Sequence, residues 1–242
     1  MISLSVVIPA YNEENRLPTT LAAVHRYLAG AEFRPIEILV VDDGSKDGTA
    51  ELVEGLRKKY PEVRLLRNPG NRGKGYSVKN GMLEATGQWV LFTDADLSAP
   101  IEELDKLYEA ARREGADVAI GSRALNRKLI GVHQSMFRET AGRFFNLMMR
   151  VLIGLPFWDT QCGFKLFKKK AAGDVFSLLR LDRFGFDVEA LFLARKLGFK
   201  TIEVPVRWNH MEGTKVSMFR DSADMFLDLL RVRWNQIKGL YK

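Results

Sequence analysis

Two aspartates one residue apart, Asp94 and Asp96, are the most chemically suggestive residues in the sequence. They follow Val90–Thr93, an apolar run of β-forming residues, and open α/β sheets bind ligands outside the carboxyl ends of their strands. If the extended chain continues through them, side-chain alternation points both carboxylates the same way. Two such oxygen donors suit Mg²⁺ or Mn²⁺ that also binds phosphate oxygens. The alternative is a surface turn, where aspartate is common.

Alternating strand and helix patterns over residues 1–121 predict the elements that position these acids. Apolar segments typical of strands cover residues 4–9, 36–41, 63–66 and 89–93. Helical periodicity separates them, with Asn15 and Asp47 expected as helix caps. This alternation predicts βαβ units and a parallel sheet. One edge of that sheet would collect the polar residues that follow the strands: Tyr11, Glu13, Asp42, Lys74, Asp94 and Asp96.

This convergence indicates a nucleotide site, with acids for the base and ribose, a metal for a diphosphate, and a basic loop nearby. Two common nucleotide motifs are absent. The P-loop pattern G-x-x-x-x-G-K-S/T occurs nowhere in the sequence. The glycine fingerprint of dinucleotide-binding folds is also missing after the first strand, where Pro9–Glu14 stands instead. P-loop ATPases and dehydrogenases are therefore not expected.

The composition is ordinary for a soluble globular chain, apart from an excess of basic residues. The 242 residues are 46% hydrophobic and 28% charged, enough for one large domain or two small ones. A net charge of +7 favours anionic partners, namely nucleic acid, acidic lipid or phosphorylated substrates. No nucleic-acid-binding motif accompanies that charge, so we expect no nucleic-acid partner.

Further sequence features narrow the compartment and the chemistry. The single cysteine, Cys162, excludes an internal disulfide and fits a reducing environment. With only three histidines and no Cys/His cluster, a zinc site is not expected. Residues 2–10 lack the basic start of a signal peptide and resemble a strand. No apolar run reaches the ~18 residues that a spanning helix needs.

The motifs together resemble a known family. Three segments are similar to family 2 glycosyltransferases of the GT-A fold: Val7–Glu14, Val41–Ser45 and Asp94–Asp96. Three more narrow the resemblance to dolichyl-phosphate sugar synthases, closest to the dolichyl-phosphate β-glucosyltransferase branch: Asn71–Gly75, Gly121–Arg123 and Asp159–Lys165. The resemblance covers nearly the whole chain. It implies an α/β fold with a mostly parallel central sheet flanked by helices, and C-terminal amphipathic helices.

The resemblance also assigns roles to individual residues. The nucleobase and ribose would be held by Pro9, Tyr11, Glu13 and Asp42, with Lys74 in the nearby basic loop. Asp94 and Asp96 would organise Mg²⁺ or Mn²⁺ and the donor diphosphate. The lipid phosphate would be received by Arg123 with Arg138 or Arg143. Further acceptor or diphosphate contacts are expected from Gln161, Asp187 and Lys215.

Two departures from relatives bear on the donor and on location. Mannosyl-transferring relatives usually carry Gln two residues after the second acid, whereas this chain has Ser98, which favours UDP-glucose over GDP-mannose. Eukaryotic glucosyl relatives tend to carry an N-terminal membrane anchor, and the sequence shows none. We therefore expect peripheral attachment to the cytoplasmic face of a membrane.

The second half of the sequence combines aromatic and basic residues. Residues 136–153 predict either a core helix with solvated arginines or an interfacial helix at a lipid headgroup boundary. Residues 186–197 predict an amphipathic helix, in which the acids of the first turn, Asp187 among them, could simply complement the helix dipole. Residues 209–217, with Lys215, predict a loop that closes over the donor. Residues 218–238 predict a final amphipathic helix.

These features predict one GT-A catalytic domain over residues 1–242. It would comprise a nucleotide-sugar half (1–121), an acceptor half (122–216) and a C-terminal amphipathic helix (217–242). The expected enzyme is an inverting, metal-dependent transferase that moves glucose from UDP-glucose to a polyprenyl phosphate. The alternatives are a GDP-mannose-dependent mannosyltransferase and a non-catalytic sugar-nucleotide-binding module. The sequence leaves the oligomeric state open.

Overall fold

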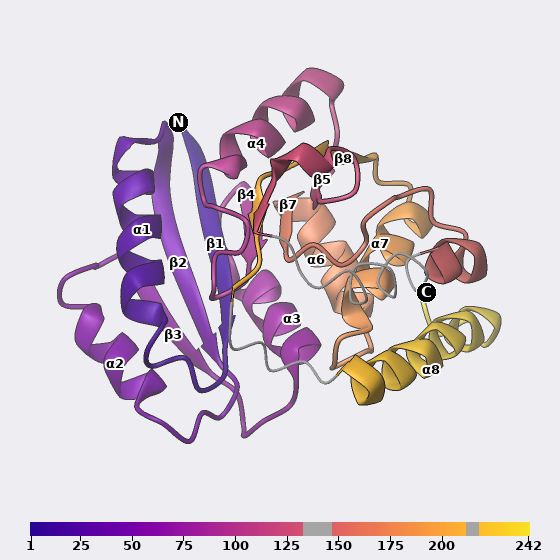
Figure 1. Cartoon of the computed structure of the whole chain (residues 1–242), viewed down its shortest axis with the longest axis horizontal. Helices are drawn as coiled ribbons and strands as arrows, with labels where there is room; N and C mark the ends of the chain where they lie inside the picture. The colour runs from indigo at the N-terminus through magenta and orange to yellow at the C-terminus, as the bar shows by residue number, and fades with distance from the viewer. Residues whose placement is uncertain (133–146, 212–217) are drawn as a thin grey trace.

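A seven-stranded sheet forms the centre of the molecule (Figure 1). The computed structural model describes residues 1–132, 147–211 and 218–242. From edge to edge the strands are β3 (Val63–Arg67), β2 (Phe33–Asp42), β1 (Ile2–Ala10), β4 (Trp89–Thr93), β7 (Phe164–Lys168), β5 (Val118–Ser122) and β8 (Thr201–Pro205). All of them run parallel to one another except β7, which is antiparallel to both neighbours, β4 and β5. The predicted mostly parallel sheet is confirmed.

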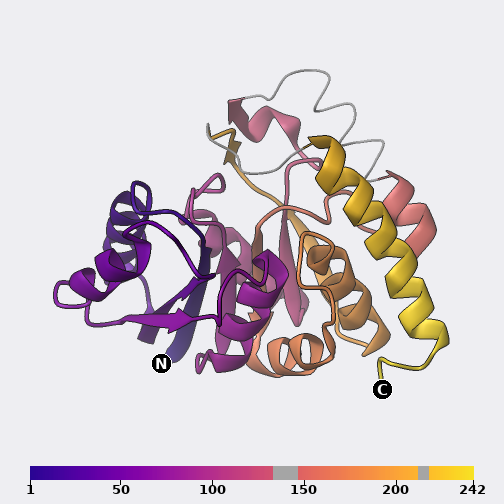
Figure 2. The same ribbon diagram turned by 90° about the horizontal axis from the view of Figure 1, so that it is seen from below.

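Helices cover both faces of this sheet (Figures 1 and 2). One face carries α1 (Leu17–Gly30), α2 (Thr49–Leu56) and α4 (Glu103–Glu114). The other carries α3 (Lys74–Glu84), a helix over 147–153, α6 (Lys169–Leu178), α7 (Phe186–Lys196) and α8 (Met218–Ile237).

Alternation along the buried strands builds a separate core on each face. In β1, Val6 and Ile8 pack under α1 and α4, while Val7 between them packs under α3. In β2, Val40 and Val41 divide in the same way. Strands buried on both faces are apolar throughout, which is why their sequence shows continuous apolar runs. The sheet is thus fixed from both sides, and its carboxyl edge is left to loops.

Several predicted details are wrong for identifiable reasons. Asn15 does not cap α1, because the helix begins two residues later and has Pro18 in its first turn, where proline's fixed φ suits the helix. Asp47 lies one residue before the cap of α2, although its carboxylate accepts the Thr49 N–H at 3.0 Å. The α7 helix is buried on every side from Phe186 to Ala194 and is not amphipathic. Strand β7 follows a motif that carried no strand prediction.

The final helix agrees with the sequence. The predicted helix over 218–238 corresponds to α8. Of the predicted helix over 136–153, the structure describes a helical segment over 147–153, and the rest lies outside the described residues. Two short strands, β6 (Ile130–Val132) and β9 (Trp208–Asn209), form a separate parallel pair, and η1 (Arg127–Leu129) precedes β6.

Candidate active site

The loops after β1 and β2 are joined into one unit at the carboxyl edge. The backbone N–H of Asn12 donates to Ser45 Oγ at 2.9 Å, and that of Glu13 donates to Thr49 Oγ1 at 2.8 Å. Asp42 ends β2, is buried, and its Oδ1 accepts the Ser45 N–H at 3.2 Å. These bonds bring the predicted nucleoside residues Tyr11, Glu13 and Asp42 to neighbouring positions at the end of β1 and β2, with Pro9 inside β1.

The next residue, Asp43, holds the glycine-rich basic loop. Its carboxylate accepts from Asn68 Nδ2 at 2.8 Å, Arg72 N at 3.0 Å and Gly73 N at 2.8 Å. Gly73 has φ +113°, and a Cβ there would overlap the carbonyl oxygen of Asp182. The buried carboxylate therefore shapes the turn that starts α3 at Lys74. Sequence reasoning assigned no role to Asp43, whose only signal was its place next to Asp42 in the Val41–Ser45 motif.

Lys74 points from this loop to the predicted metal ligands. Its Nζ lies 2.7 Å from Asp94 Oδ1 and 5.5 Å from the centre of the Phe92 ring. Burial disfavours the charged amine, but Asp94, Asp187 and Asp96 together raise the pKa of Lys74 above its ordinary value. The lysine is therefore held as a cation beside the two acids, where a phosphate group would also be attracted.

Asp94 and Asp96 lie in a turn and not in an extended strand. β4 ends at Thr93, the Leu97 N–H donates to the Asp94 carbonyl at 3.2 Å, and Leu97 has φ +47°. Asp96 Oδ1 accepts the Ser98 N–H at 2.9 Å. Strand alternation therefore does not orient these carboxylates, and that premise of the prediction is wrong. Their place at the sheet edge is as expected. Thr20 on α1 fixes the turn by donating to the Ala95 carbonyl at 2.6 Å.

The donor set of this turn fits a hard divalent cation with few protein ligands. Within residues 1–132, 147–211 and 218–242, no group of three or more His, Cys, Asp or Glu side chains could enclose a metal. Asp94 and Asp96 offer carboxylate oxygens only, which suits Mg²⁺ or Mn²⁺ that takes its remaining ligands from phosphate and water. Lys74 already contacts one of these oxygens and marks the turn as a cation-binding position.

Arg123 follows β5 and is bound by a buried acid. Its Nε and Nη2 donate to the two oxygens of Asp159 at 2.6 and 2.8 Å, and its guanidinium lies 5.5 Å from the Trp208 ring centre. Burial alone would raise the pKa of Asp159, but the guanidinium overrides it and holds that pKa below its usual range. Burial disfavours the charged guanidinium, but Asp159, with smaller contributions from Cys162 and Asp94, raises the pKa of Arg123 above its ordinary value. The arginine is thus a fixed cation, 31% exposed, close to the acid-bearing turn.

Replacing Asp159 by Asn should lower the free energy of unfolding by about 3 kcal/mol, because it leaves a largely buried guanidinium without its counter-ion. Because the pKa of Asp159 is lowered in the folded state, this contribution to stability is fully present above the unfolded-state pKa of about 4. It is lost as the pH falls below that value toward the folded-state pKa. Urea unfolding at pH 7 and pH 3.5 measures both effects. Asp174→Asn, which breaks the exposed Lys170 pair on α6, should change the free energy by less than ~1 kcal/mol.

The predicted acceptor residues Gln161 and Asp187 have different partners. Gln161 Nε2 lies 2.9 Å from Met225 Sδ on α8. Asp187 is buried in the first turn of α7, where it makes an ion pair with Lys165 of β7 and caps nothing. Burial raises the pKa of Asp187 in spite of Lys165 and Lys74 nearby. Sequence reasoning missed Lys165, whose only signal was a lysine between Phe164 and Leu166 in an apolar strand.

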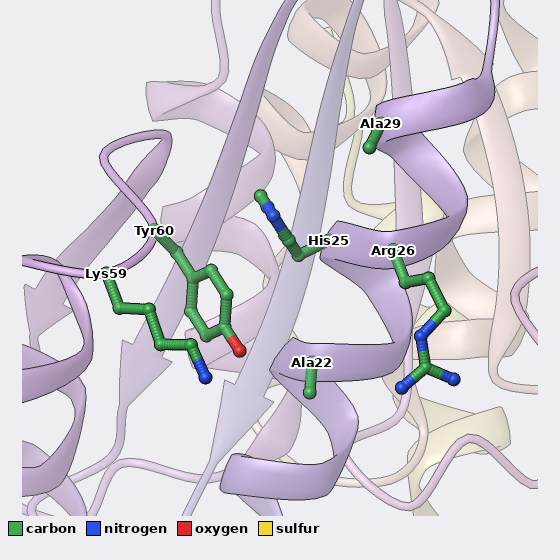
Figure 3. Close-up of a pocket in the computed structure, with 6 residues that line it drawn as sticks. All are labelled: Ala22, His25, Arg26, Ala29, Lys59 and Tyr60. Carbon is green, nitrogen blue, oxygen red and sulfur yellow. The ribbon is translucent and has the colours of Figure 1, made fainter.

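The remaining candidate site residues are either buried or lie outside the described residues. Cys162 is buried, and burial raises the pKa of its thiol to about 12, as expected of an inert cysteine. Arg138, Arg143 and Lys215 lie outside the described residues, so their roles stay predictions. A surface hollow lies elsewhere, lined by α1 and by Lys59 and Tyr60 before β3 (Figure 3). None of its lining residues is among the predicted site residues.

Comparison with known proteins identifies the family. A family model described as glycosyl transferase family 2 matches residues 5–176. The chain belongs to this family. The prediction of a family 2 glycosyltransferase is therefore confirmed.

Several similar proteins are named dolichyl-phosphate β-glucosyltransferases. The dolichyl-phosphate β-glucosyltransferase of Dictyostelium discoideum is 36% identical over 252 residues, covering 100% of this chain and 77% of that protein. The human enzyme of the same name is 35% identical over 99% of this chain and 77% of its own length. That of Saccharomyces cerevisiae is 34% identical, with 100% and 77% covered. The predicted resemblance to this branch is confirmed.

Solved structures of this fold agree with the predicted GT-A architecture. Glucosyl-3-phosphoglycerate synthase from Mycobacterium tuberculosis, crystallised with Mn²⁺, UDP-glucose and phosphoglyceric acid, matches with a TM-score of 0.68 and 19% identity. The match covers 96% of this chain and 79% of that one. Mannosyl-3-phosphoglycerate synthase from Rubrobacter xylanophilus matches with a TM-score of 0.64 and 17% identity, covering 98% and 75%. At these identities the likeness establishes the fold.

Proposed function

We propose that this glycosyltransferase moves glucose, with inversion, from UDP-glucose to a polyprenyl phosphate of the dolichyl type. The observation that carries the proposal is the similarity to dolichyl-phosphate β-glucosyltransferases over 99–100% of this chain and 77% of theirs, at 34–37% identity. The edge built by the loops after β1, β2 and β4 supports it, since it combines a buried acid for the nucleoside with a cation beside two carboxylates.

In this proposal each element of the edge has a task. Asp42, with Pro9, Tyr11 and Glu13, binds the uridine, and Asp42 accepts the uracil N–H. Asp94 and Asp96 hold Mg²⁺ or Mn²⁺, which neutralises the leaving diphosphate when bound. The Mn²⁺ bound by a synthase of the same fold supports this choice of metal. Lys74, whose Nζ lies 2.7 Å from Asp94 Oδ1, would donate to the diphosphate.

The acceptor phosphate attacks the anomeric carbon without a side-chain base. A phosphate monoester carries about 1.5 to 2 negative charges near pH 7, so its oxygen is already a nucleophile. The protein's task is to bring this anion to the sugar, and arginine offers a fork that matches phosphate. Arg123 suits this role, because Asp159 takes up only the Nε and one Nη2 donor of its guanidinium, and the other N–H groups can meet the phosphate. Asp187 is the candidate for a catalytic base among the described residues. It is buried against Lys165, which makes it unsuited to take a proton from the substrate.

Donor profiling tests the proposal directly. With a short polyprenyl phosphate and Mn²⁺ or Mg²⁺, UDP-glucose should be used at least about tenfold more efficiently than GDP-mannose, because uridine and guanine present different groups to a buried acid. The measurement is kcat/KM for each donor. Equal or better use of GDP-mannose would contradict UDP-glucose as the donor and favour a mannosyltransferase. Donor binding without any transfer or hydrolysis would indicate a non-catalytic sugar-nucleotide-binding module.

The proposed enzyme reaches its lipid substrate from the membrane surface. Among the described residues no helix is both long and apolar enough to cross a bilayer. The helix over 147–153 and α8 lie side by side, joined by Arg233 Nε donating to the Leu152 carbonyl at 2.6 Å (Figure 2). α8 buries Leu229 and Val232 but exposes an apolar stripe on its other side: Leu227, Leu230, Trp234 and Ile237. Exposed Arg231 and Lys238 flank it. Such a face suits the headgroup boundary of the cytoplasmic leaflet.

Membrane attachment should therefore be peripheral. We expect high salt or alkaline carbonate to release the protein, since each basic residue near an anionic surface adds roughly 1 kcal/mol. Ile237→Ser, at a side chain that is 78% exposed, should weaken binding to anionic vesicles at least about tenfold, because it removes about 1.5–3 kcal/mol of apolar burial. Leu83→Ser on α3, also exposed, is the control and should leave vesicle sedimentation unchanged. Retention through carbonate extraction would contradict peripheral attachment.

A further inference from the structure

A buried ion pair lies directly behind the acid-bearing turn. Lys165 of β7 is 1% exposed, and its Nζ makes an ion pair with Asp187 of α7, which is 5% exposed. Lys165 stands opposite Phe92 across the β4–β7 pairing, and its Nζ lies 5.8 Å from the centre of that ring. The pair is thus enclosed by a strand, a helix and an aromatic side chain. No step of the proposed reaction uses it.

Lys165 also fixes the backbone that touches Asp94. Its Nζ donates to the Cys162 carbonyl at 2.7 Å. The next residue, Gly163, accepts the Asp94 N–H at 3.2 Å through its carbonyl oxygen. A Cβ on Gly163 would overlap the Asp94 carboxylate, so this backbone lies in contact with the predicted metal ligand. A continuous set of contacts therefore runs from Asp187 through Lys165 and the 162–163 backbone to Asp94.

Stability alone does not account for a buried pair at this place. Removing two charges from water costs several kcal/mol each, and apolar residues of similar volume are often as stabilising as the pair or more so. The neighbouring strand positions Phe164, Leu166 and Phe167 are apolar and fully buried, which shows what this core otherwise uses. What an apolar side chain cannot do is donate to the Cys162 carbonyl and so hold the 162–163 backbone in place.

We propose that Lys165 and Asp187 are positioning residues that hold the Cys162–Gly163 backbone against Asp94 and thereby set the place of its carboxylate. Asp187 orients the lysine, and the lysine fixes the carbonyl. The expected effect on metal binding rests on the proposed function of Asp94 as a metal ligand. The expected effect on the position of the Asp94 turn does not depend on that function. Removing both charges should loosen the Asp94 turn and weaken Mn²⁺ binding without affecting the acceptor site.

The test compares the wild type with Lys165→Met/Asp187→Leu, which removes both charges and leaves no unpaired ion. Amide exchange of the Asp94 N–H, followed by NMR without metal or substrate, should accelerate at least about tenfold relative to Val90 and Leu91 of β4. Mn²⁺ affinity in the presence of UDP, read by electron paramagnetic resonance, should fall at least about tenfold, as when a supporting partner of a metal ligand is lost. The kcat should fall with it, while the KM for the lipid phosphate stays within about twofold.

Two further variants keep the test decisive. Lys168→Met removes the exposed Asp117 pair three residues along the same strand, and should leave Asp94 exchange and Mn²⁺ affinity unchanged. Asp187→Asn keeps a hydrogen-bond acceptor beside Lys165 and should accelerate amide exchange of the Asp94 N–H less, about threefold. This variant provides the test if the double variant does not fold. A folded double variant with wild-type exchange at Asp94 would overturn the inference. A wild type that transfers no glucose would overturn the proposed function and leave the exchange result to decide this one.

Discussion

Asp96→Asn should reduce glucosyl transfer at least about 100-fold and leave the fold unchanged. Losing a carboxylate ligand removes several kcal/mol of charge stabilisation from the leaving diphosphate, and each ~1.4 kcal/mol is tenfold in rate. The fold should persist because the Asn side-chain carbonyl can still accept the Ser98 N–H that Asp96 Oδ1 accepts at 2.9 Å. Steady-state kcat with UDP-glucose and urea unfolding measure the two effects separately.

The control for this variant is another Asp→Asn change at the surface. Asp174→Asn removes one carboxylate on α6 and should leave transfer within about twofold of the wild type, since it breaks only an exposed ion pair. Excess EDTA should abolish wild-type activity, and added Mn²⁺ or Mg²⁺ should restore it. Full activity in EDTA, or in Asp96→Asn, would contradict a metal held by this turn.

Arg123→Ala should raise the KM for the lipid phosphate at least about tenfold while the affinity for UDP-glucose changes less than about twofold. A charge-assisted bond to a phosphate is worth about 1.5–3 kcal/mol, and Arg123 is paired with Asp159 after β5, not with the loops after β1 and β2. Initial rates with each substrate varied in turn provide the two constants. UDP-glucose binding by calorimetry gives an independent value for the donor.

Two companion variants separate this effect from a loss of structure. Arg123→Ala leaves the buried Asp159 unpaired, so Arg123→Ala/Asp159→Asn should fold better and show the same acceptor defect. Arg64→Ala, which breaks the Glu37 ion pair on β3, should leave both substrate constants unchanged. Normal acceptor kinetics in both Arg123 variants would show that this arginine has a structural role only. The acceptor phosphate would then be bound by other cations.

The parallel part of the sheet was predictable because its signals are local. β1, β2 and β4 contain apolar runs, β3 is a shorter segment with Arg64 and Arg67 among apolar residues, and each of the four is followed by a helix. The rule that parallel strands deliver ligands at their carboxyl ends placed Asp42, Asp94 and Asp96 at that edge. β7 carried no such signal. Its five residues include two lysines and follow a loop motif, and only its pairing with β4 and β5, far away in the sequence, makes it a strand. Short antiparallel insertions depend on tertiary partners more than on residue type.

The same distinction separates the parts of the site. Strand ends predicted which acids lie at the carboxyl edge, but residue type did not reveal which charges are already paired. Arg123 resembles a free phosphate-binding arginine in the sequence, and the structure shows that Asp159 holds it in a bidentate pair. Lys165 resembles a surface lysine, and the fold buries it against Asp187. Such pairings join residues distant in sequence, and periodicity carries no information about them.

The antiparallel insertion of β7 has a consequence for how the chain folds as it is synthesised. β4 and β5 have both been synthesised by residue 122, yet neither can complete its pairing until Phe164–Lys168 follows and inserts between them. Until then each strand offers an open edge, the kind of surface on which chains aggregate. Pairing over such a sequence separation is also slow. We therefore expect nascent chains that end before residue 164 to depend on chaperones, and the acid-bearing turn, which needs the Gly163 carbonyl, to form only late in translation.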